Sequence, residues 1–265
     1  TSLEARIAAR YAINLRNEPE STDWLKGWLN ESLLTEYALR ALLDRKEREE
    51  LNLAPIIETM LDHENPRVQL QAVAGAARVG RKELTSSLLR LSLEEGRLPL
   101  VQDVPHVHDA IPHTARRALI AMSPLEKLHA ALSDEALRNQ ALAVLRQIHS
   151  PKNITLLIGA LEKAENEAAQ LEIAAVLLRL YHREKEWDGE SFWGTRPNSA
   201  GPYYQGVTWE ESEKIATALR TAVAGMGEEA QKEILFQVRR HNLALEELDL
   251  PIEVDPLEQL LEQPG

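Results

Sequence analysis

Apolar residues recur with helical spacing along most of the first 183 residues of the chain. The segment LAPIIETMLDH shows the pattern clearly. Its apolar positions lie three and four residues apart, on one face of a helix: Leu53, Ile56, Ile57, Met60 and Leu61. Asn65-Pro66 then predicts a turn with proline at the first helical position, before a second helix that ends near Gly80. Alternating strand-like segments are scarce, so the sequence predicts an all-α fold built from helix pairs.

The same helix pair recurs, with a small residue in the middle of each second helix. The aligned positions, at uneven intervals, are Ala38, Ala72, Ala118, Ala141 and Ala174. A small side chain lets a neighbouring helix approach closely, as stacked helix pairs require. We therefore expect these alanines at helix–helix contacts in a right-handed α-solenoid of about five or six helix pairs. An ordinary helical bundle is the alternative.

Short polar motifs predict where several helices begin. Ser123 with Glu126, and Thr208 with Glu211, have the spacing of capping boxes. Ser150 stands before a proline and is expected to cap the helix that follows.

The unit at 51–80 resembles a HEAT repeat. It has an apolar helix, then Asp62, then Pro66-Arg67-Val68, and an alanine-rich helix that closes on a glycine. It is shorter than the usual ~40 residues of that repeat and is more similar to the short bacterial HEAT-like variety. The resemblance implies one HEAT-like domain over 1–265. In that domain, helix-pair repeats occupy 1–183, a loop insertion 184–208, and terminal helices with an acidic tail 209–265.

The insertion and the residue that follows it hold half of the aromatic residues of the chain. Between 187 and 209 these are Trp187, Phe192, Trp193, Tyr203, Tyr204 and Trp209. Loops of this length are usually functional or disordered, and a segment so aromatic is unlike a disordered one. We therefore expect an ordered loop that folds back on the last repeats.

Within this loop, Gly201-Pro202 predicts a turn, after which Tyr203 and Tyr204 cannot both face the same side if the chain is extended. We assign Trp193 and Trp209 to packing, and Arg196 with one of the two tyrosines to an exposed rim. Aromatic residues and arginine are enriched at binding hot spots. The candidate binding residues are Trp193, Arg196, Tyr203 and Tyr204. The alternative is plain packing, in which the tryptophans, Trp187 included, cover the edge of one helix pair.

The segment 181–215 also resembles the HEAT-repeat region of large multidomain exported proteins of Planctomycetes and related bacteria. WGTRP at 193–197 and GPYY at 201–204 carry most of the match, and IPHTARRAL at 111–119 agrees more loosely. In those proteins the HEAT region accompanies a β-propeller dehydrogenase-like domain and a c-type haem domain. The resemblance implies a bacterial multidomain fragment with a periplasmic or otherwise exported location. It transfers no redox residue to this chain, which has no Cys for haem attachment.

Charge and composition narrow the range of partners. The formal net charge is −12, and 241–265 holds seven acidic residues and no Lys or Arg. This balance disfavours nucleic acid and anionic lipid, and a DNA-reading helical repeat would need a continuous basic groove. No apolar run approaches the ~20 residues of a membrane span. We expect no nucleic acid partner and no membrane insertion.

The segment DVPHVHDAIPH is the candidate metal site. A His-x-His pair with a third histidine and nearby aspartates could hold zinc: Asp103, His106, His108, Asp109 and His113. However, Pro105 and Pro112 predict that the segment is a connection between helices, with His113 near the start of the next helix. Loop histidines of this kind are more often solvated or capping residues. We expect no metal and no cofactor.

Catalytic signals are scarce. No nucleophile elbow, zinc-protease motif, P-loop or dinucleotide fingerprint occurs in the sequence. We therefore expect a monomer that is not an enzyme. We expect a non-catalytic HEAT-repeat scaffold or protein–protein interaction module, whose partner is another protein or the adjacent domains of the same polypeptide. The alternative is a ligand- or glycan-binding module, with or without catalysis, that uses the 187–209 loop and the adjacent concave face.

Overall fold

The computed structural model describes residues 2–16, 18–45, 51–93, 107–190 and 202–252. Contacts divide the chain into two units, Thr1–Val144 and Leu145–Gly265. The single domain over 1–265 stays a prediction. Among the described residues, no helix has both the length and the apolar character to cross a membrane.

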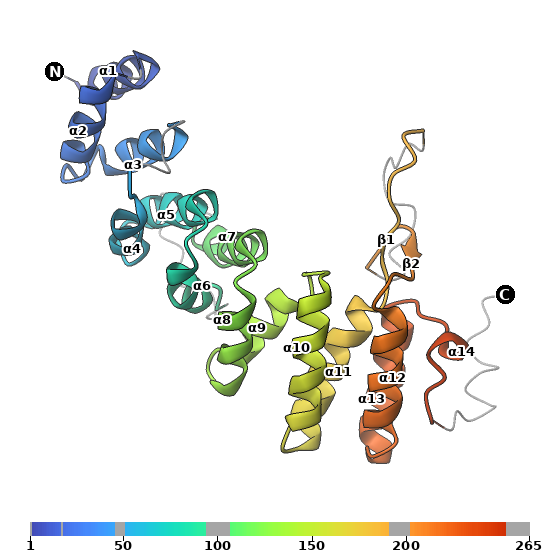
Figure 1. Ribbon diagram of the computed structural model, residues 1–265. Coiled ribbons are helices and arrows are strands. Elements are labelled where there is room, and N and C mark those ends of the chain that lie inside the picture. Colours follow the sequence, from blue (N-terminus) through green and yellow to red (C-terminus); the bar gives the residue numbers. More distant parts are fainter. Residues whose placement is uncertain (1, 17, 46–50, 94–106, 191–201, 253–265) are drawn as a thin grey trace. The chain divides into compact units, whose positions relative to one another are not determined.

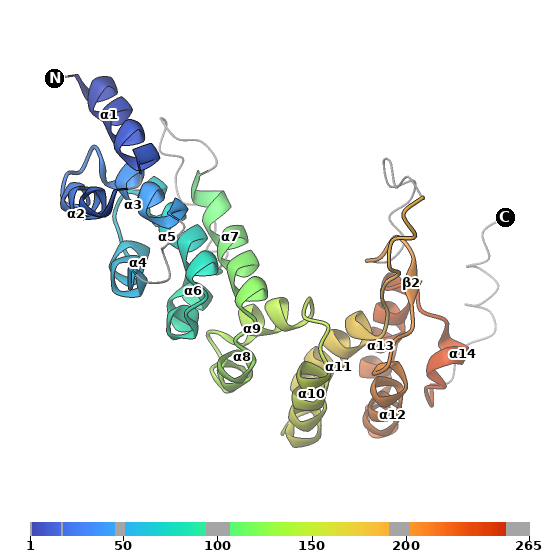
Figure 2. The ribbon, with the colours of Figure 1, turned by 45° about the horizontal axis from the view of Figure 1, so that its top comes forward.

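The first unit is a succession of helices, which Figures 1 and 2 show in chain order. These are α1 (Leu3–Arg16), α2 (Pro19–Trp28), α3 (Thr35–Asp44), α4 (Ala54–Leu61), α5 (Pro66–Val79), α6 (Thr85–Leu91), α7 (Val107–Met122), α8 (Leu125–Ala130) and α9 (Arg138–Leu145). Short 3₁₀ turns precede α6 and follow α8. Helix α5 packs against α4, and also against α3 and α7. In Figure 2, α4 and α6 lie on one side of this unit and α5 and α7 on the other.

Helix α5 begins and ends where the sequence predicts. The Asn65 side chain accepts a hydrogen bond from the backbone N–H of Arg67 at 3.0 Å, and Pro66 is the first helical residue. At the other end, Gly80 has φ +66°, the left-handed conformation that glycine adopts without a Cβ clash. The predicted helix over 66–80 is confirmed.

The predicted small residues lie in the cores of the two units. None of Ala38, Ala72, Ala118, Ala141 and Ala174 is more than 2% exposed, so their predicted burial is confirmed. The approach of α3 to α5 is close. A Cβ added at Gly75 of α5 would lie 2.6 Å from Cδ1 of Leu43, so only glycine fits there without a shift of Leu43.

Two of the predicted helix starts are wrong. Ser123 has φ +45°, and its hydroxyl donates to the carbonyl of Ile120 at 2.7 Å. Helix α8 therefore begins at Leu125 without a side-chain cap among the described residues. Helix α12 begins at Ser212 and not after Thr208, because the Ser212 hydroxyl accepts from the Trp209 N–H and donates to the carbonyl of Tyr181 at the end of α11. The predicted Ser150 cap is confirmed, since its hydroxyl accepts from Asn153 N–H at 3.2 Å.

Helix α7 also begins earlier than the prolines indicated. It starts at Val107 and contains Pro112, so the predicted connection through this proline is wrong. Proline has a fixed φ that suits a helix, and its main cost there is one backbone hydrogen bond together with the ring's steric demand.

The second unit holds α10 (Pro151–Lys163), α11 (Glu167–Leu180), α12 (Ser212–Val223), α13 (Glu228–Arg240) and α14 (Leu245–Leu248). Helix α10 packs against α11 and α12, and α11 packs against α12 and α13. Figure 1 shows α10 to α13 side by side, with two strands projecting beyond one end of these helices. The strands are β1 (Arg183–Glu184) and β2 (Gly206–Val207), and they pair antiparallel. The described chain is thus mostly helical, as predicted, but the strand pair was not predicted.

Candidate functional site

The strand pair joins the two ends of the aromatic insertion. Arg183 pairs with Val207 and Glu184 with Gly206, and Lys185 N–H donates to the carbonyl of Gln205 at 2.8 Å. We call residues 183–185 and 203–207 the hairpin base. Strands of two residues are marginal by themselves, so other contacts must hold this base in place.

The Glu184 carboxylate supplies one such contact. One oxygen accepts from Tyr204 N–H at 2.8 Å and the other from Gln205 N–H at 2.7 Å. A carboxylate that accepts two backbone N–H groups makes charge-assisted hydrogen bonds, which are stronger than neutral ones. Glu184 therefore ties the returning strand to the outgoing one.

Tyr203 connects the hairpin base to the helices. Its hydroxyl donates to the carbonyl of Arg179 at 3.0 Å and lies 2.8 Å from Nε2 of His149. The guanidinium of Arg179 donates to the same hydroxyl, and it lies 4.4 Å from the centroid of the Tyr203 ring, a cation–π distance. His149 Nε2 also lies 2.9 Å from the carbonyl of His182. Tyr203 thus fixes the base to the end of α11 and to the turn before α10.

Trp209 packs at the same place. Its indole N–H donates to the carbonyl of Leu180 at 2.9 Å, and its ring meets His149 edge to face at 5.6 Å. This agrees with the prediction of Trp209 as a packing residue. Trp187, in contrast, is 64% exposed, which is not expected of a residue that covers the edge of a helix pair.

The candidate binding residues fall into two groups. Tyr203 is packed and Tyr204 is 38% exposed, so the two rings differ in burial, as the predicted turn required. Trp193 and Arg196 lie outside the described residues. Sequence reasoning missed His149, Arg179 and Glu184. They lie 54, 24 and 20 positions from their partners Tyr203 and Tyr204, so no local pattern connects them.

Two histidines near the hairpin base are affected by burial and by neighbouring arginines. Burial lowers the pKa of His149, and the charges of Arg179 and Arg183 lower it further, against the opposing hydrogen bond to His182. Burial also lowers the pKa of His241 to about 4, with further contributions from Arg179, Arg240 and Arg146. Both shifts favour the neutral imidazole.

A separate pocket of about 840 Å³ lies along α10 and α12. Its lining comes from these two helices, from α11 and from the turn after α12: Ile158, Leu161, Glu162, Gln170, Glu213, Lys214, Thr217, Ala218, Thr221, Ala222 and Gly225. It is therefore not the loop-based site that the ligand-binding alternative expected.

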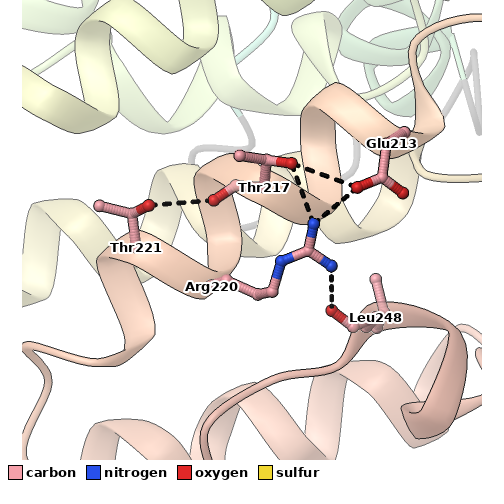
Figure 3. Close-up of polar contacts among 5 residues, drawn as sticks. All are labelled: Glu213, Thr217, Arg220, Thr221 and Leu248. Atoms are coloured by element: carbon pink, nitrogen blue, oxygen red, sulfur yellow. Dashed lines mark hydrogen bonds and ion pairs between the residues drawn. The ribbon is translucent and has the colours of Figure 1, made fainter.

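One wall of this pocket is a polar row on α12, shown in Figure 3. Arg220 donates to Glu213 at 2.6 Å and to the Thr217 hydroxyl at 3.0 Å, and its other terminal nitrogen donates to the carbonyl of Leu248 at 3.2 Å. These bonds hold the Glu213 carboxylate, and the Arg220 guanidinium lowers the pKa of that carboxyl group. The wall is thus fixed by contacts that reach as far as α14.

The candidate metal segment is only partly described. Asp103, His106 and the side chains of His108 and Asp109 lie outside the described residues, and His113 is exposed. Within the part of the chain that the structure describes, no three His, Cys, Asp or Glu side chains are grouped as metal ligands. The absence of a metal from the protein stays a prediction.

No family model and no curated protein matches the chain. Among solved structures, human deoxyhypusine hydroxylase in complex with glycerol aligns with 15% identity over 91% of each chain, with a TM-score of 0.31. A hydroxylase is an enzyme, so this match contradicts the prediction that the chain is not an enzyme, and that exclusion is withdrawn. A likeness at this TM-score assigns no reaction to the chain.

Proposed function

We propose that this chain is a HEAT-like, right-handed α-solenoid that binds a protein partner, or adjacent domains of its own polypeptide, at the hairpin base. The packing within each unit supports the repeat architecture. In the first unit, α5 packs against α3 and α7, and in the second, α11 packs against α13. In a helical repeat protein, each second helix packs against the second helix of the next repeat in this way. The resemblance of the insertion favours a place in a multidomain exported bacterial protein.

The observation that carries this proposal is the fixation of the hairpin base by Tyr203. Three polar contacts of its hydroxyl and the stacked Arg179 hold the base against the end of α11. The exposed side chains of Trp187 and Tyr204 belong to the segments that this base holds together. Binding at such a surface costs less conformational entropy than binding at a free loop, because the backbone of the hairpin base is already ordered.

Arginines near the hairpin base offer positions where an acidic group of the partner could bind. Arg183 is exposed on β1, and Arg179, Arg146 and Arg240 act together on His241. Complementary charge raises the association rate and disfavours wrong partners. Trp187 itself lies between the exposed carboxylates of Glu186 and Asp188, so the surface beside the exposed aromatic residues has mixed charge.

Site-specific photocross-linking in cells of the source organism tests the proposal. The photoreactive residue p-benzoylphenylalanine replaces Tyr204, and in the control protein it replaces Phe236, which is 54% exposed on α13. We expect cross-linking at position 204, either to one protein or to another domain of the same polypeptide, and no such product at position 236. The absence of a product at 204, or the same products at both positions, would contradict the proposed surface.

A further inference from the structure

The pocket along α10 and α12 has the dimensions of a small-molecule site. Its volume of about 840 Å³ lies in the range of roughly 300–1,000 Å³ that such sites occupy. Ile158 and Leu161 of α10 face it from one side, and Ala218 and Ala222 of α12 from the other. These side chains give the pocket an apolar floor.

Small residues on α12 explain why the pocket is there. Near their first turns the two helices are linked, because the Lys214 ammonium donates to the Thr155 hydroxyl at 3.3 Å. Farther along α12, the positions toward α10 are Ala218 and Ala222, and the chain then reaches Gly225. Alanine and glycine cannot fill the space that a larger side chain would occupy, so the helices leave an opening between their second halves.

The polar lining consists mostly of hydrogen-bond acceptors. The Thr221 hydroxyl donates to the Thr217 carbonyl at 3.1 Å, and the Thr217 hydroxyl donates to Glu213 at 3.3 Å, so both protons are used within α12 (Figure 3). Their oxygens can still accept. The amide nitrogen of Gln170 points to the carbonyl of Ala164, at 3.5 Å, which leaves its oxygen as an acceptor.

The charged groups of the lining follow the same trend. Glu213 is already paired with Arg220, and the cation of the lining, Lys214, is paired with Glu211 at 3.1 Å. Glu162 remains, since no ion pair or hydrogen bond of its carboxylate occurs among the described residues. An occupant that satisfies this lining must donate hydrogen bonds, and a positive charge suits Glu162 best.

We propose that this pocket binds a small organic cation, an ammonium group on an apolar body. The ammonium group lies at Glu162 and Thr221, and the apolar body lies against Ile158, Leu161 and Ala222. The site is independent of the hairpin base, so its test and that of the partner surface fail separately.

Calorimetric titration with three six-carbon probes tests the charge preference. The probes are n-hexylammonium, its neutral analogue n-hexanol and the anion hexanoate. We expect hexylammonium to bind with the lowest dissociation constant and hexanoate with the highest. Because Glu162 is exposed, its charge should lower the dissociation constant of hexylammonium by up to roughly fivefold, the range of a surface ion pair. Equal affinity for hexylammonium and hexanoate, or heat changes no larger than dilution for all three probes, would overturn the proposal.

Three variants locate the binding. Glu162→Gln should lower the affinity for hexylammonium about threefold or more and leave the affinity for hexanol unchanged, because it removes only the charge. Glu210→Gln, an exposed carboxylate before α12 and outside the pocket, is the matched control and should change neither affinity. Ala222→Phe should occupy the space where the apolar body lies and weaken the binding of every probe about tenfold. If Ala222→Phe does not fold, the comparison of Glu162→Gln with Glu210→Gln tests the site. Equal changes of hexylammonium affinity in these two variants would refute it.

Discussion

Removal of a single hydroxyl group tests how the hairpin base is held. In Tyr203→Phe the ring and its stacking with Arg179 remain, but three polar contacts of the hydroxyl are lost. The Arg179 guanidinium is only half-buried and can find water. The Arg179 carbonyl then loses its bond to the hydroxyl in a partly buried place, and Nε2 of His149 keeps its contact with the carbonyl of His182.

The expected cost follows from these contacts. A neutral hydrogen bond contributes about 1 kcal/mol and one to a charged group about 1.5–3 kcal/mol, and water replaces part of the loss. We therefore expect opening of the hairpin base to become easier by about 1–3 kcal/mol. Global unfolding is a poor readout, because a chain of two units need not unfold in one step.

Hydrogen exchange at the amides of Tyr204 and Gln205 reports the opening directly, since both are bonded to Glu184. In Tyr203→Phe these amides should exchange roughly 5- to 150-fold faster. The control is Tyr204→Phe, which removes the same group from a 38% exposed side chain and should change the exchange rates by about twofold at most. Unchanged rates in Tyr203→Phe would show that its hydroxyl does not hold the base.

Two further predictions concern the core and the histidines. Ala72→Leu should destabilise the fold by about 1–3 kcal/mol, because the side chain is fully buried, whereas Ala9→Leu on an exposed face of α1 should have almost no effect; equal melting temperatures of the two would refute the repeat alignment. The folded-state pKa of His241, about 4, lies below the ordinary value of 6.5, so the unfolded chain binds more protons between these values. The free energy of unfolding therefore has its full value above pH 6.5. It decreases as the pH falls toward 4, by on the order of 1 kcal/mol after allowance for the partial exposure of His241. Between about pH 7.5 and pH 5, the melting temperature of His241→Gln should fall by less than that of the wild type. An equal fall would contradict this assignment.

The helices could be predicted from the sequence because their signals are local. The spacing of apolar residues, the cap at Asn65 and the left-handed Gly80 all lie within one turn of the structure they specify. The predicted caps were wrong where a serine hydroxyl donates to a different acceptor. Ser123 donates backward to Ile120, and Ser212 reaches Tyr181 on another helix, so the residues with the capping-box spacing do not start those helices.

The hairpin base could be predicted only in part. The composition of the insertion indicated an ordered aromatic segment, and its described ends agree with that expectation. The contacts that fix it depend on tertiary structure. His149 and Arg179 become neighbours of Tyr203 only after α10 and α11 have packed, and Glu184 meets two amides that lie 20 and 21 positions away. Periodicity contains no information about such pairs.

The binding of the partner itself is the most direct test of the proposed function. With the protein identified by cross-linking at position 204, its affinity is measured for the wild-type chain, for the double variant Trp187→Ala/Tyr204→Ala, and for Phe236→Ala. If the aromatic surface at the hairpin base binds the partner, the double variant should lose at least about tenfold in affinity, as hot-spot residues do, and Phe236→Ala should bind like the wild type. Equal affinity of all three proteins would contradict the account.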